Sequence, residues 1–302
     1  MIDVSPKFNT LRYARAGGVL LAEKETIKRI NENTVPKGDV LATARSAGIQ
    51  AAKKTSEWLV FCHSMPIDWV DVTFEINFNK IHVIAEVKSI WKTGVEMEAL
   101  CAVSAALLNI YDMLKPLDET LSISDIKLLQ KTGWKSDFKD QFEVPVKAAV
   151  LVISDGVYSG KRQDKSGKII QEFLTTQAVE VKEFQVLADE IELIRNKLID
   201  LIDNQKIDLI FTTGGTGLGP RDVTPEATQE VIHKSIPGIA EAIRRHGKER
   251  TPYAMLSREV CGVRNQSIII NLPGSSKGVK ESLHAIFPGL LHAFPILHGS
   301  GH

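Results

Sequence analysis

Glycine and acidic residues that follow a short apolar stretch are the first whose spacing suggests chemistry. Residues 207–211 are apolar apart from Asp208 and include two β-branched isoleucines, as in a strand buried on both faces, and residues 212–217 then read Thr-Thr-Gly-Gly-Thr-Gly. Glycine permits positive φ angles and lets bare backbone amides approach a ligand. Thr224, Pro225 and Glu226 have the residue types expected at the N-cap, first and second positions of a helix, whose N-terminus favours anions.

Arg221 and Asp222 lie between these glycines and the predicted helix start, and they add a cation and a possible metal ligand. Spacing alone leaves two interpretations open. The stretch is either an ordinary strand-to-helix turn with a solvated Arg–Asp pair, or a site for a phosphate group and Mg²⁺.

A second group of polar residues lies on a predicted helix at residues 97–114. Glu96 and Glu98 are at its start, where the helix macrodipole stabilises carboxylates or where they accept hydrogen bonds from a guanine-like ring. Asp112 and Lys115 follow at i, i+3 spacing and therefore lie on one helix face. They form an exposed ion pair, or else the lysine perturbs the acid and both act on one substrate.

The elements that hold this second group predict an α+β domain. Residues 70–78 and 81–87 alternate between apolar and polar side chains, as half-buried antiparallel strands do. Helices packed against one face of such a sheet complete a ferredoxin-like layer. One further short strand and two helices are predicted at residues 59–62, 38–57 and 97–114.

The elements around the glycine-rich stretch predict a different fold, an α/β doubly wound and mainly parallel sheet, because apolar strands alternate with helices. Ligands bind such sheets beyond the carboxyl ends of the strands. Four loops are expected to meet there, and they contain Ser154 with Asp155, Asp189, residues 213–222, and Pro273 with Gly274 and Ser275. The predicted strands are residues 148–153, 179–186, 207–211 and 267–271, and the clearest helices are residues 168–175 and 189–204.

Composition narrows the classes of protein that fit the chain. Its 302 residues, 43% of them hydrophobic, suffice for two domains with proper cores, which we place at residues 1–143 and 147–298. Basic and acidic residues number 37 each, so no basic field predicts nucleic-acid binding. Three widely spaced cysteines argue against a disulfide or zinc framework. Without an apolar leader or a run of about 18 apolar residues, we expect a soluble cytoplasmic protein that does not bind membranes.

The first half resembles the MoaC family, cyclic pyranopterin monophosphate synthases of molybdenum cofactor biosynthesis. The family usually continues its Cys-His pair with Pro-Leu, whereas Ser64, Met65 and Pro66 follow here. The matching segments are residues 1–5 (MIDVS), 37–40 (KGDV), 42–45 (ATAR), 47–53 (AGIQAAK), 62–63 (CH), 92–100 (KTGVEMEAL) and 110–113 (IYDM), with Leu128, Leu129 and Lys131.

This resemblance implies an enzyme that rearranges a cyclised 7,8-dihydro-GTP intermediate into cyclic pyranopterin monophosphate and expels pyrophosphate, without a redox cofactor. Asp112 would be the catalytic acid or base, assisted by Lys115, and Lys37 and Lys131 would contact the triphosphate. Cations assist pyrophosphate departure, and ring opening and closure need proton transfer near neutrality. Further residues would line the pocket for the base and sugar, namely Phe61, Cys62, His63, Glu96, Met97 and Glu98.

The second half resembles the MogA/MoaB family, which also belongs to molybdenum cofactor biosynthesis. The combination of TTGGTG with RDVTP is more specific than an isolated glycine motif. The matching segments are residues 154–155, 159–160, 189–190, 212–217, 221–225, 237–238, 256–258 and 271–274, with Asp164 and Gly167.

This second resemblance implies adenylyl transfer from Mg-ATP to molybdopterin. Asp189 and Asp222 would hold Mg²⁺, because this ion prefers a few carboxylates together with phosphate oxygens. Loop residues would bind the pterin phosphate or the nucleotide, namely Thr213, Gly214, Gly215, Thr216, Gly217, Ser154, Asp155, Pro273, Gly274 and Ser275.

The two resemblances together predict a bifunctional enzyme that acts on small molecules. Members of both families are oligomers, hexameric in the first and trimeric or hexameric in the second, so a homo-oligomer is expected. In the first family the active site is built across a subunit contact. The alternative hypothesis is a synthase with a single activity, whose second half is a non-catalytic pterin-binding or oligomerising module.

Overall fold

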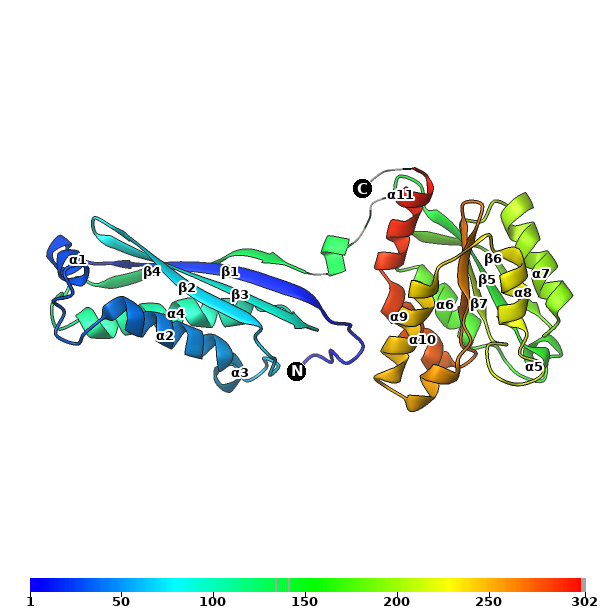
Figure 1. Ribbon diagram of the computed structural model, residues 1–302, viewed down its shortest axis with the longest axis horizontal. Coiled ribbons are helices and arrows are strands. Elements are labelled where there is room, and N and C mark those ends of the chain that lie inside the picture. The colour runs from blue at the N-terminus through cyan, green and yellow to red at the C-terminus, as the bar shows by residue number, and fades with distance from the viewer. Residues whose placement is uncertain (134, 139, 141, 300–302) are drawn as a thin grey trace. The chain divides into compact units, whose positions relative to one another are not determined.

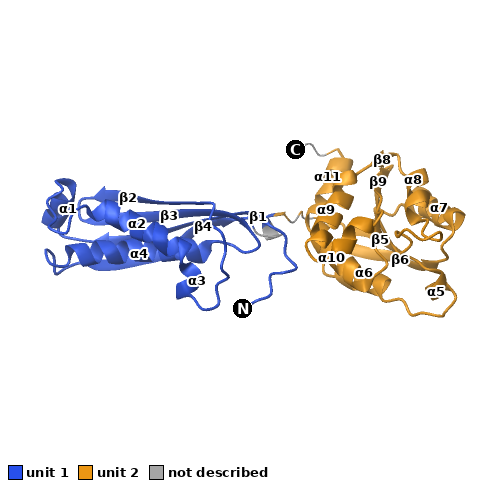
Figure 2. Cartoon of the chain, turned by 60° about the horizontal axis from the view of Figure 1, so that its bottom comes forward, with its two compact units in different colours: residues 1–137 blue, residues 138–302 orange. Residues whose placement is uncertain are grey.

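The computed structural model describes residues 1–133, 135–138, 140 and 142–299, and these residues form two compact units (Figure 2). The first unit is Met1–Asp137 and the second is Phe138–His302. Residues 142–146, which span the end of the first predicted domain and the gap before the second, belong to the second unit: Phe142 packs against its core, and Val146 begins its first strand.

The first unit is an antiparallel sheet with the strand order β2-β3-β1-β4. Helices α2 and α4 cover one of its faces (Figure 1). The β-α-β-β-α-β succession and this strand order confirm the predicted ferredoxin-like α+β fold. Its elements are β1 (Thr10–Leu21), α1 (Lys24–Asn31), α2 (Val40–Lys53), α3 (Thr55–Trp58), β2 (Trp69–Asn77), β3 (Lys80–Trp91), α4 (Glu96–Leu114), β4 (Ser122–Thr132) and the 3₁₀ turn η1 (Lys135–Phe138).

Alternation along β3 directs Ile81, Val83 and Val87 into the core, where they are fully buried. Helix α4 packs closely on this sheet because Gly18 of β1 has no side chain. A Cβ atom at Gly18 would lie 2.6 Å from Leu107 Cδ1. By length and composition α4 is the one helix among the described residues able to span a bilayer, but 61% of its apolar window is buried inside the unit. It is the core helix of the first unit.

Two features of the first unit differ from the prediction. Residues 59–62, predicted as a strand, form a turn after α3, and the side chains of Val60 and Phe61 are 83% and 77% exposed. The predicted strand was wrong because the apolar side chains of residues 59–62 were expected to be buried in a sheet. No strand among the described residues of this unit pairs with these residues. Two strands, the central strand β1 and the edge strand β4, were not predicted.

The second unit is a six-stranded sheet with the order β6-β5-β7-β10-β9-β8. The pairs among β6, β5, β7 and β10 are parallel, and β9 and β8 are antiparallel, which confirms the predicted mainly parallel α/β fold. Helices cover both sheet faces (Figure 1). The strands are β5 (Val146–Ile153), β6 (Val179–Leu187), β7 (Leu209–Thr213), β8 (Lys234–Ser235), β9 (Cys261–Arg264) and β10 (Ser267–Leu272).

Apolar residues on both faces of the central strands hold these helices. Strand β7 is buried along its whole length, and β10 is buried as well. The helices are α5 (Asp155–Tyr158), α6 (Ser166–Leu174), α7 (Ile191–Ile199), α8 (Thr224–Val231), α9 (Pro237–Lys248), α10 (Ser276–Ile286) and α11 (Ala293–Leu297), and shorter turns are η2 (Asp200–Asn204), η3 (Pro252–Leu256) and η4 (Gly289–His292).

Candidate functional sites

Asp112, in the last turn of α4, lies between two lysines. Its Oδ1 is 2.8 Å from Lys115 Nζ and its Oδ2 is 2.8 Å from Lys37 Nζ. Hydrogen bonds from Lys115 and then Lys37 lower the pKa of Asp112 to about 2. The carboxylate is therefore ionised at neutral pH, and the cluster carries one net positive charge at an exposed position.

The loop before α2 presents Lys37 to this cluster. Gly38 has a φ of +94°, which favours glycine, and Asp39 caps α2 by accepting a hydrogen bond from the Ala42 amide at 2.9 Å. The turn at Gly38 and the cap at Asp39 together fix the position of the backbone at Lys37. The KGDV segment is thus the local sequence that brings this lysine to α4.

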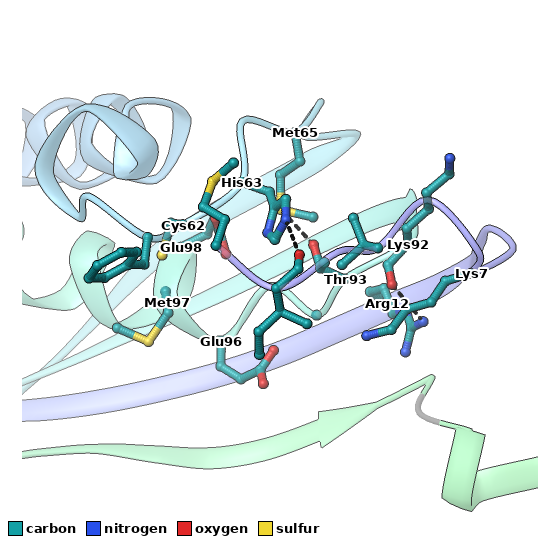
Figure 3. A pocket seen from close by; sticks show the side chains of 15 residues that line it. Lys7, Arg12, Cys62, His63, Met65, Lys92, Thr93, Glu96, Met97 and Glu98 are labelled. Atoms are coloured by element: carbon teal, nitrogen blue, oxygen red, sulfur yellow. Dashed lines mark hydrogen bonds between the residues drawn. The ribbon is translucent and has the colours of Figure 1, made fainter.

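A cavity of about 720 Å³ opens at the other end of α4. All six residues that the sequence predicts for the base and sugar pocket line it, together with cations that the prediction missed (Figure 3). Figure 3 shows the cations at one end of the cavity and the acidic residues toward the other. The predicted residues are Phe61, Cys62, His63, Glu96, Met97 and Glu98, and the missed cations are Lys7, Arg12 and Lys92.

Arg12 is held at this cavity by backbone carbonyls. It is buried, and its guanidinium donates to Trp91 O and Lys92 O, at 3.3 Å each, and to Gly133 O. Arg12 lies on β1, a strand that the sequence analysis did not predict. Residues 10–21 contain a second arginine, Arg15, so the sequence carries no signal that singles out Arg12.

Glu98 is the buried acid of this cavity. Only 4% of the residue is exposed, and its Oε2 has no hydrogen-bond partner among the described residues. Burial, with a smaller contribution from the charge of Glu96, raises the pKa of Glu98 to about 7. A carboxyl group with this pKa can donate or accept a proton near neutrality.

We expect this burial to make the stability of the first unit depend on pH. Because the pKa is raised on folding, the stability that protonated Glu98 contributes is present at acidic pH and is lost as the pH rises through about 7. Relative to Glu98→Gln, the wild type should lose roughly 2 to 3 kcal/mol between pH 5 and pH 8. Urea unfolding followed by tryptophan fluorescence measures this loss for the first unit alone, because all four tryptophans of the chain belong to it. They are Trp58, Trp69, Trp91 and Trp134.

Glu57→Gln is the control for this measurement, since Glu57 is an exposed glutamate of the same unit. The free energy of unfolding of Glu57→Gln should change with pH as that of the wild type does. A Glu98→Gln protein whose pH dependence equals that of the wild type would contradict the assignment of a raised pKa.

His63 lines the cavity, and Lys131 lies beside Glu96, another residue of its lining. Lys131 Nζ is 3.8 Å from Glu96 Oε1, and His63 Nε2 is 2.9 Å from the Ile2 carbonyl oxygen. Among the residues that depart from the family pattern, Met65 lines the cavity, and the Pro66 carbonyl accepts a hydrogen bond from Ser89 Oγ at 2.7 Å.

The structure does not bring Asp112 and the cavity together within one chain. Glu98 and Asp112 are on the same helix and 14 residues apart, which corresponds to about 21 Å along its axis. The Lys37–Asp112–Lys115 cluster and the cavity are therefore two separate groups of side chains at opposite ends of α4.

The glycine-rich loop of the second unit follows β7. Gly214 and Gly215 have φ angles of +101° and +63°, and a Cβ atom at Gly214 would lie 2.2 Å from the Ile153 carbonyl oxygen. Only glycine fits this position. Thr224, predicted as the N-cap of α8, instead lies in its first turn after Val223 and donates its hydroxyl to Gly214 O at 2.9 Å.

Three carboxylates border this loop, and one of them is paired. Arg221 donates to both carboxylate oxygens of Asp155, at 3.0 and 3.1 Å, and so does not form the Arg221–Asp222 pair of the first interpretation that the sequence left open. Asp155 and Asp189 accept hydrogen bonds from each other's backbone amides, at 3.1 and 2.8 Å. The partner of Arg221 is set by the neighbouring loop and not by its sequence neighbour.

Asp189 and Asp222 lie against the glycines. A Cβ atom at Gly215 would be 3.1 Å from Asp189 Oδ1, and one at Gly217 would be 2.8 Å from Asp222 Oδ2. Burial raises the pKa of Asp189, and the charges of Asp155 and then Asp222 add to this effect. Two neighbouring, partly desolvated carboxylates are stabilised by a cation.

These residues fit Mg²⁺, which binds through one or two carboxylates and completes its shell with water and phosphate oxygens. Within the described ranges no cluster of three or more His, Cys, Asp or Glu side chains forms a closed metal cage. The two aspartates beside an anion-binding loop are suited to a metal that arrives with a phosphate.

The remaining predicted loop lies against the glycine-rich one. Thr213 Oγ1 donates to the Pro273 carbonyl at 2.8 Å, and a Cβ atom at Gly274 would lie 3.3 Å from Gly214 Cα. Ser275 caps α10 by accepting a hydrogen bond from the Gly278 amide at 3.1 Å. Ser154 likewise occupies the cap position of α5, where its hydroxyl accepts from the Val157 amide.

Comparison with known proteins identifies both halves of the chain. Residues 1–134 match the MoaC family, and residues 149–292 match the family described as a probable molybdopterin binding domain. Both resemblances seen in the sequence are thereby confirmed.

Individual relatives agree with this division. The chain is 41% identical to a molybdenum cofactor biosynthesis bifunctional protein of Chlorobaculum tepidum, over 100% of this chain and 96% of the relative. A cyclic pyranopterin monophosphate synthase of Clostridium acetobutylicum is 50% identical, over 46% of this chain and 88% of that protein. A molybdopterin adenylyltransferase of Helicobacter pylori is 43% identical, over 50% of this chain and 87% of that protein. Because the first similarity extends over both units, the chain belongs to the family of bifunctional molybdenum cofactor biosynthesis proteins.

Proposed function

We propose that the chain catalyses an early and a late reaction of molybdenum cofactor biosynthesis. The first unit converts the cyclised 7,8-dihydro-GTP intermediate into cyclic pyranopterin monophosphate and pyrophosphate. The second unit transfers AMP from Mg-ATP to molybdopterin. The observation that carries this proposal is that each unit has its own site for phosphate charge, within a chain similar over its whole length to bifunctional relatives. The three cysteines are free, which fits the reducing cytoplasm as the compartment.

The charge distribution of the first cavity orients its substrate. Lys7, Arg12 and Lys92 line one end and suit the triphosphate, whereas Glu96 and Glu98 line the other and suit the N–H groups of the base. Glu98, with a pKa of about 7, transfers protons during opening and closure of the ring. The cations stabilise the charge that develops as pyrophosphate leaves.

The first active site is completed by a second copy of the chain. Asp112, Lys115 and Lys37 lie about 21 Å along α4 from the cavity of their own chain, too far to act on the same substrate. In a homo-oligomer, which we expect to be a hexamer, the cluster of one copy meets the cavity of another. Asp112 then orients Lys37 and Lys115 and accepts a proton, and Lys131 contacts the triphosphate.

Mixing two inactive variants tests this arrangement. Asp112→Ala changes one half of the proposed site, the cluster, and His63→Ala changes the other half, the cavity. When equal amounts are unfolded together and reassembled, subunits combine at random, so about a quarter of the sites should contain an intact cluster and an intact cavity. Formation of the cyclic product by each variant alone and by the mixture measures this. A mixture as inactive as its components would show that both halves of the site must come from one chain.

In the second unit, Asp189 and Asp222 would hold Mg²⁺, which would neutralise phosphate charge. The amides of residues 215–217 bind phosphate oxygens, and Arg221 keeps Asp155 in place beside them. A phosphate oxygen of molybdopterin attacks the α-phosphorus of ATP, the bond from that phosphorus to the bridging oxygen breaks, and pyrophosphate leaves. The contribution of the protein is positioning and charge neutralisation.

The alternative, a second unit that only binds pterin, is separated from this proposal by product analysis. The full chain is incubated with molybdopterin, ATP and Mg²⁺, and adenylylated molybdopterin and pyrophosphate are quantified. Their appearance supports the transferase. Tight binding of molybdopterin in titration calorimetry without AMP transfer would instead show a binding module.

A further inference from the structure

We propose that Arg258 is a positioning residue that holds the loop of residues 217–222, and through it Asp222, in the geometry that binds the metal–nucleotide complex. The proposal rests on the proposed adenylyl transfer but concerns a residue that lies outside the predicted site. Arg258 follows η3 and precedes β9.

The side chain of Arg258 joins both ends of this loop. Its Nε donates to Gly217 O at 2.7 Å, and its Nη2 donates to Asp222 O at 2.6 Å. Its Nη1 pairs with Glu226 in the first turn of α8. One guanidinium group therefore fixes the residue where the loop begins, the residue where it ends, and the helix that follows.

The backbone of Arg258 continues the same contact. Its amide donates to Thr216 O at 3.0 Å. Glycines within the loop lower its intrinsic order, and Leu218 at its tip is 69% exposed. Asp222 itself closes the loop by accepting a hydrogen bond from the Gly219 amide at 2.7 Å. The position of Asp222 therefore depends on contacts that come from Arg258.

Sheet topology explains why this arginine reaches the loop. Cys261 of β9 pairs with Ile270 of β10, near the carboxyl end of β10, and Asn271 exchanges hydrogen bonds with Val260. Residues just before β9 therefore lie at the sheet edge where the glycine-rich loop follows β7. Because β9 is antiparallel to β10, the residues that precede β9, and not those that follow it, lie near the site.

Lysine cannot replace this arginine, because two carbonyl oxygens and a carboxylate require the separate donors of a planar guanidinium. We expect Arg258→Lys and Arg258→Gln to weaken Mn²⁺ binding in the presence of a non-hydrolysable ATP analogue by about 10- to 100-fold, the usual effect of losing a residue that orients a metal ligand. Hydrogen–deuterium exchange of residues 217–222 should accelerate in both variants without nucleotide. Glu226→Gln, which leaves the two carbonyl contacts of Arg258 intact, should show a smaller effect on both quantities.

Arg264→Gln is the matched control. Arg264 binds Asp203 with two nitrogen atoms, at 3.2 and 2.6 Å, and donates to Val231 O at 3.3 Å, so it has the same kinds of partner. It pairs with Ser267 at the other end of β10. We expect this variant to keep wild-type Mn²⁺ affinity and exchange at residues 217–222.

Equal effects of Arg258→Gln and Arg264→Gln on Mn²⁺ affinity would overturn the proposal, because the role of Arg258 would then be general stability. Unchanged exchange of residues 217–222 in Arg258→Gln would overturn it as well. Neither measurement requires AMP transfer. A chain that fails to adenylylate molybdopterin, yet shows the arginine-dependent exchange and Mn²⁺ affinity, would refute the proposed transferase and leave the positioning role standing.

Discussion

Replacing Asp112 with alanine should lower the formation of cyclic pyranopterin monophosphate by about 10²- to 10⁴-fold, the range for loss of a proton-transfer group. The variant loses the carboxylate that holds Lys37 and Lys115 at 2.8 Å, so two cations lose their orientation as well. Product formation from the cyclised dihydro-GTP intermediate measures the effect.

The control for this variant is Glu57→Ala. Glu57 forms an exposed i, i+3 pair with Lys54 in the same unit, with a 3.7 Å separation, and should keep wild-type turnover. Adenylylation by the same Asp112→Ala protein should also be unchanged, which shows that the chain is folded. Near-normal turnover of Asp112→Ala and of Lys115→Ala would refute the roles assigned to both residues.

Asp222→Asn should reduce AMP transfer to molybdopterin by more than about 100-fold, since a metal ligand matters more than the residues that orient it. The side-chain oxygen of asparagine can still accept the hydrogen bond that the Gly219 amide donates to Asp222, so the loop is preserved while the charge is lost. Asp189→Asn should act similarly, because its oxygen still accepts the Asp155 amide. Initial rates at increasing Mg²⁺ concentration measure both effects.

Asp200→Asn provides the matched control, because Asp200 is in the same unit and is hydrogen-bonded to Asn204 and Gln205, away from the loop. Its adenylylation rate should equal that of the wild type. Formation of the cyclic product by Asp222→Asn should also remain normal. If Asp222→Asn and Asp189→Asn both transfer AMP at the wild-type rate, the proposed metal site is wrong.

The elements that follow from local rules were predicted well. The helix at residues 97–114 appears as α4, one residue longer, because its apolar periodicity and its acidic start depend only on neighbours along the chain. The alternation in residues 70–78 and 81–87 likewise appears in β2 and β3. The prediction for residues 59–62 failed because the same apolar composition suits a buried strand and an exposed turn.

Residues that act from a distance were not predictable in this way. Arg12 required the central strand β1, whose pattern gave no clear period, and Arg258 required knowledge that β9 runs antiparallel beside β10. For the same reason the sequence left the partner of Arg221 open, and the structure shows it to be Asp155. A long side chain has many polar groups within reach, and the strand order selects among them.

The sequence by itself determined that the chain has two units of different fold class, and it determined which segments contain their polar residues. It did so because glycine conformation, helix periodicity and strand alternation are local properties. Only the tertiary structure decided that Asp112 and Glu98 lie at opposite ends of one helix, and that the Gly217–Asp222 loop is held by Arg258. Distances between side chains depend on how elements pack and on the length of the helix between them, which residue type alone does not encode.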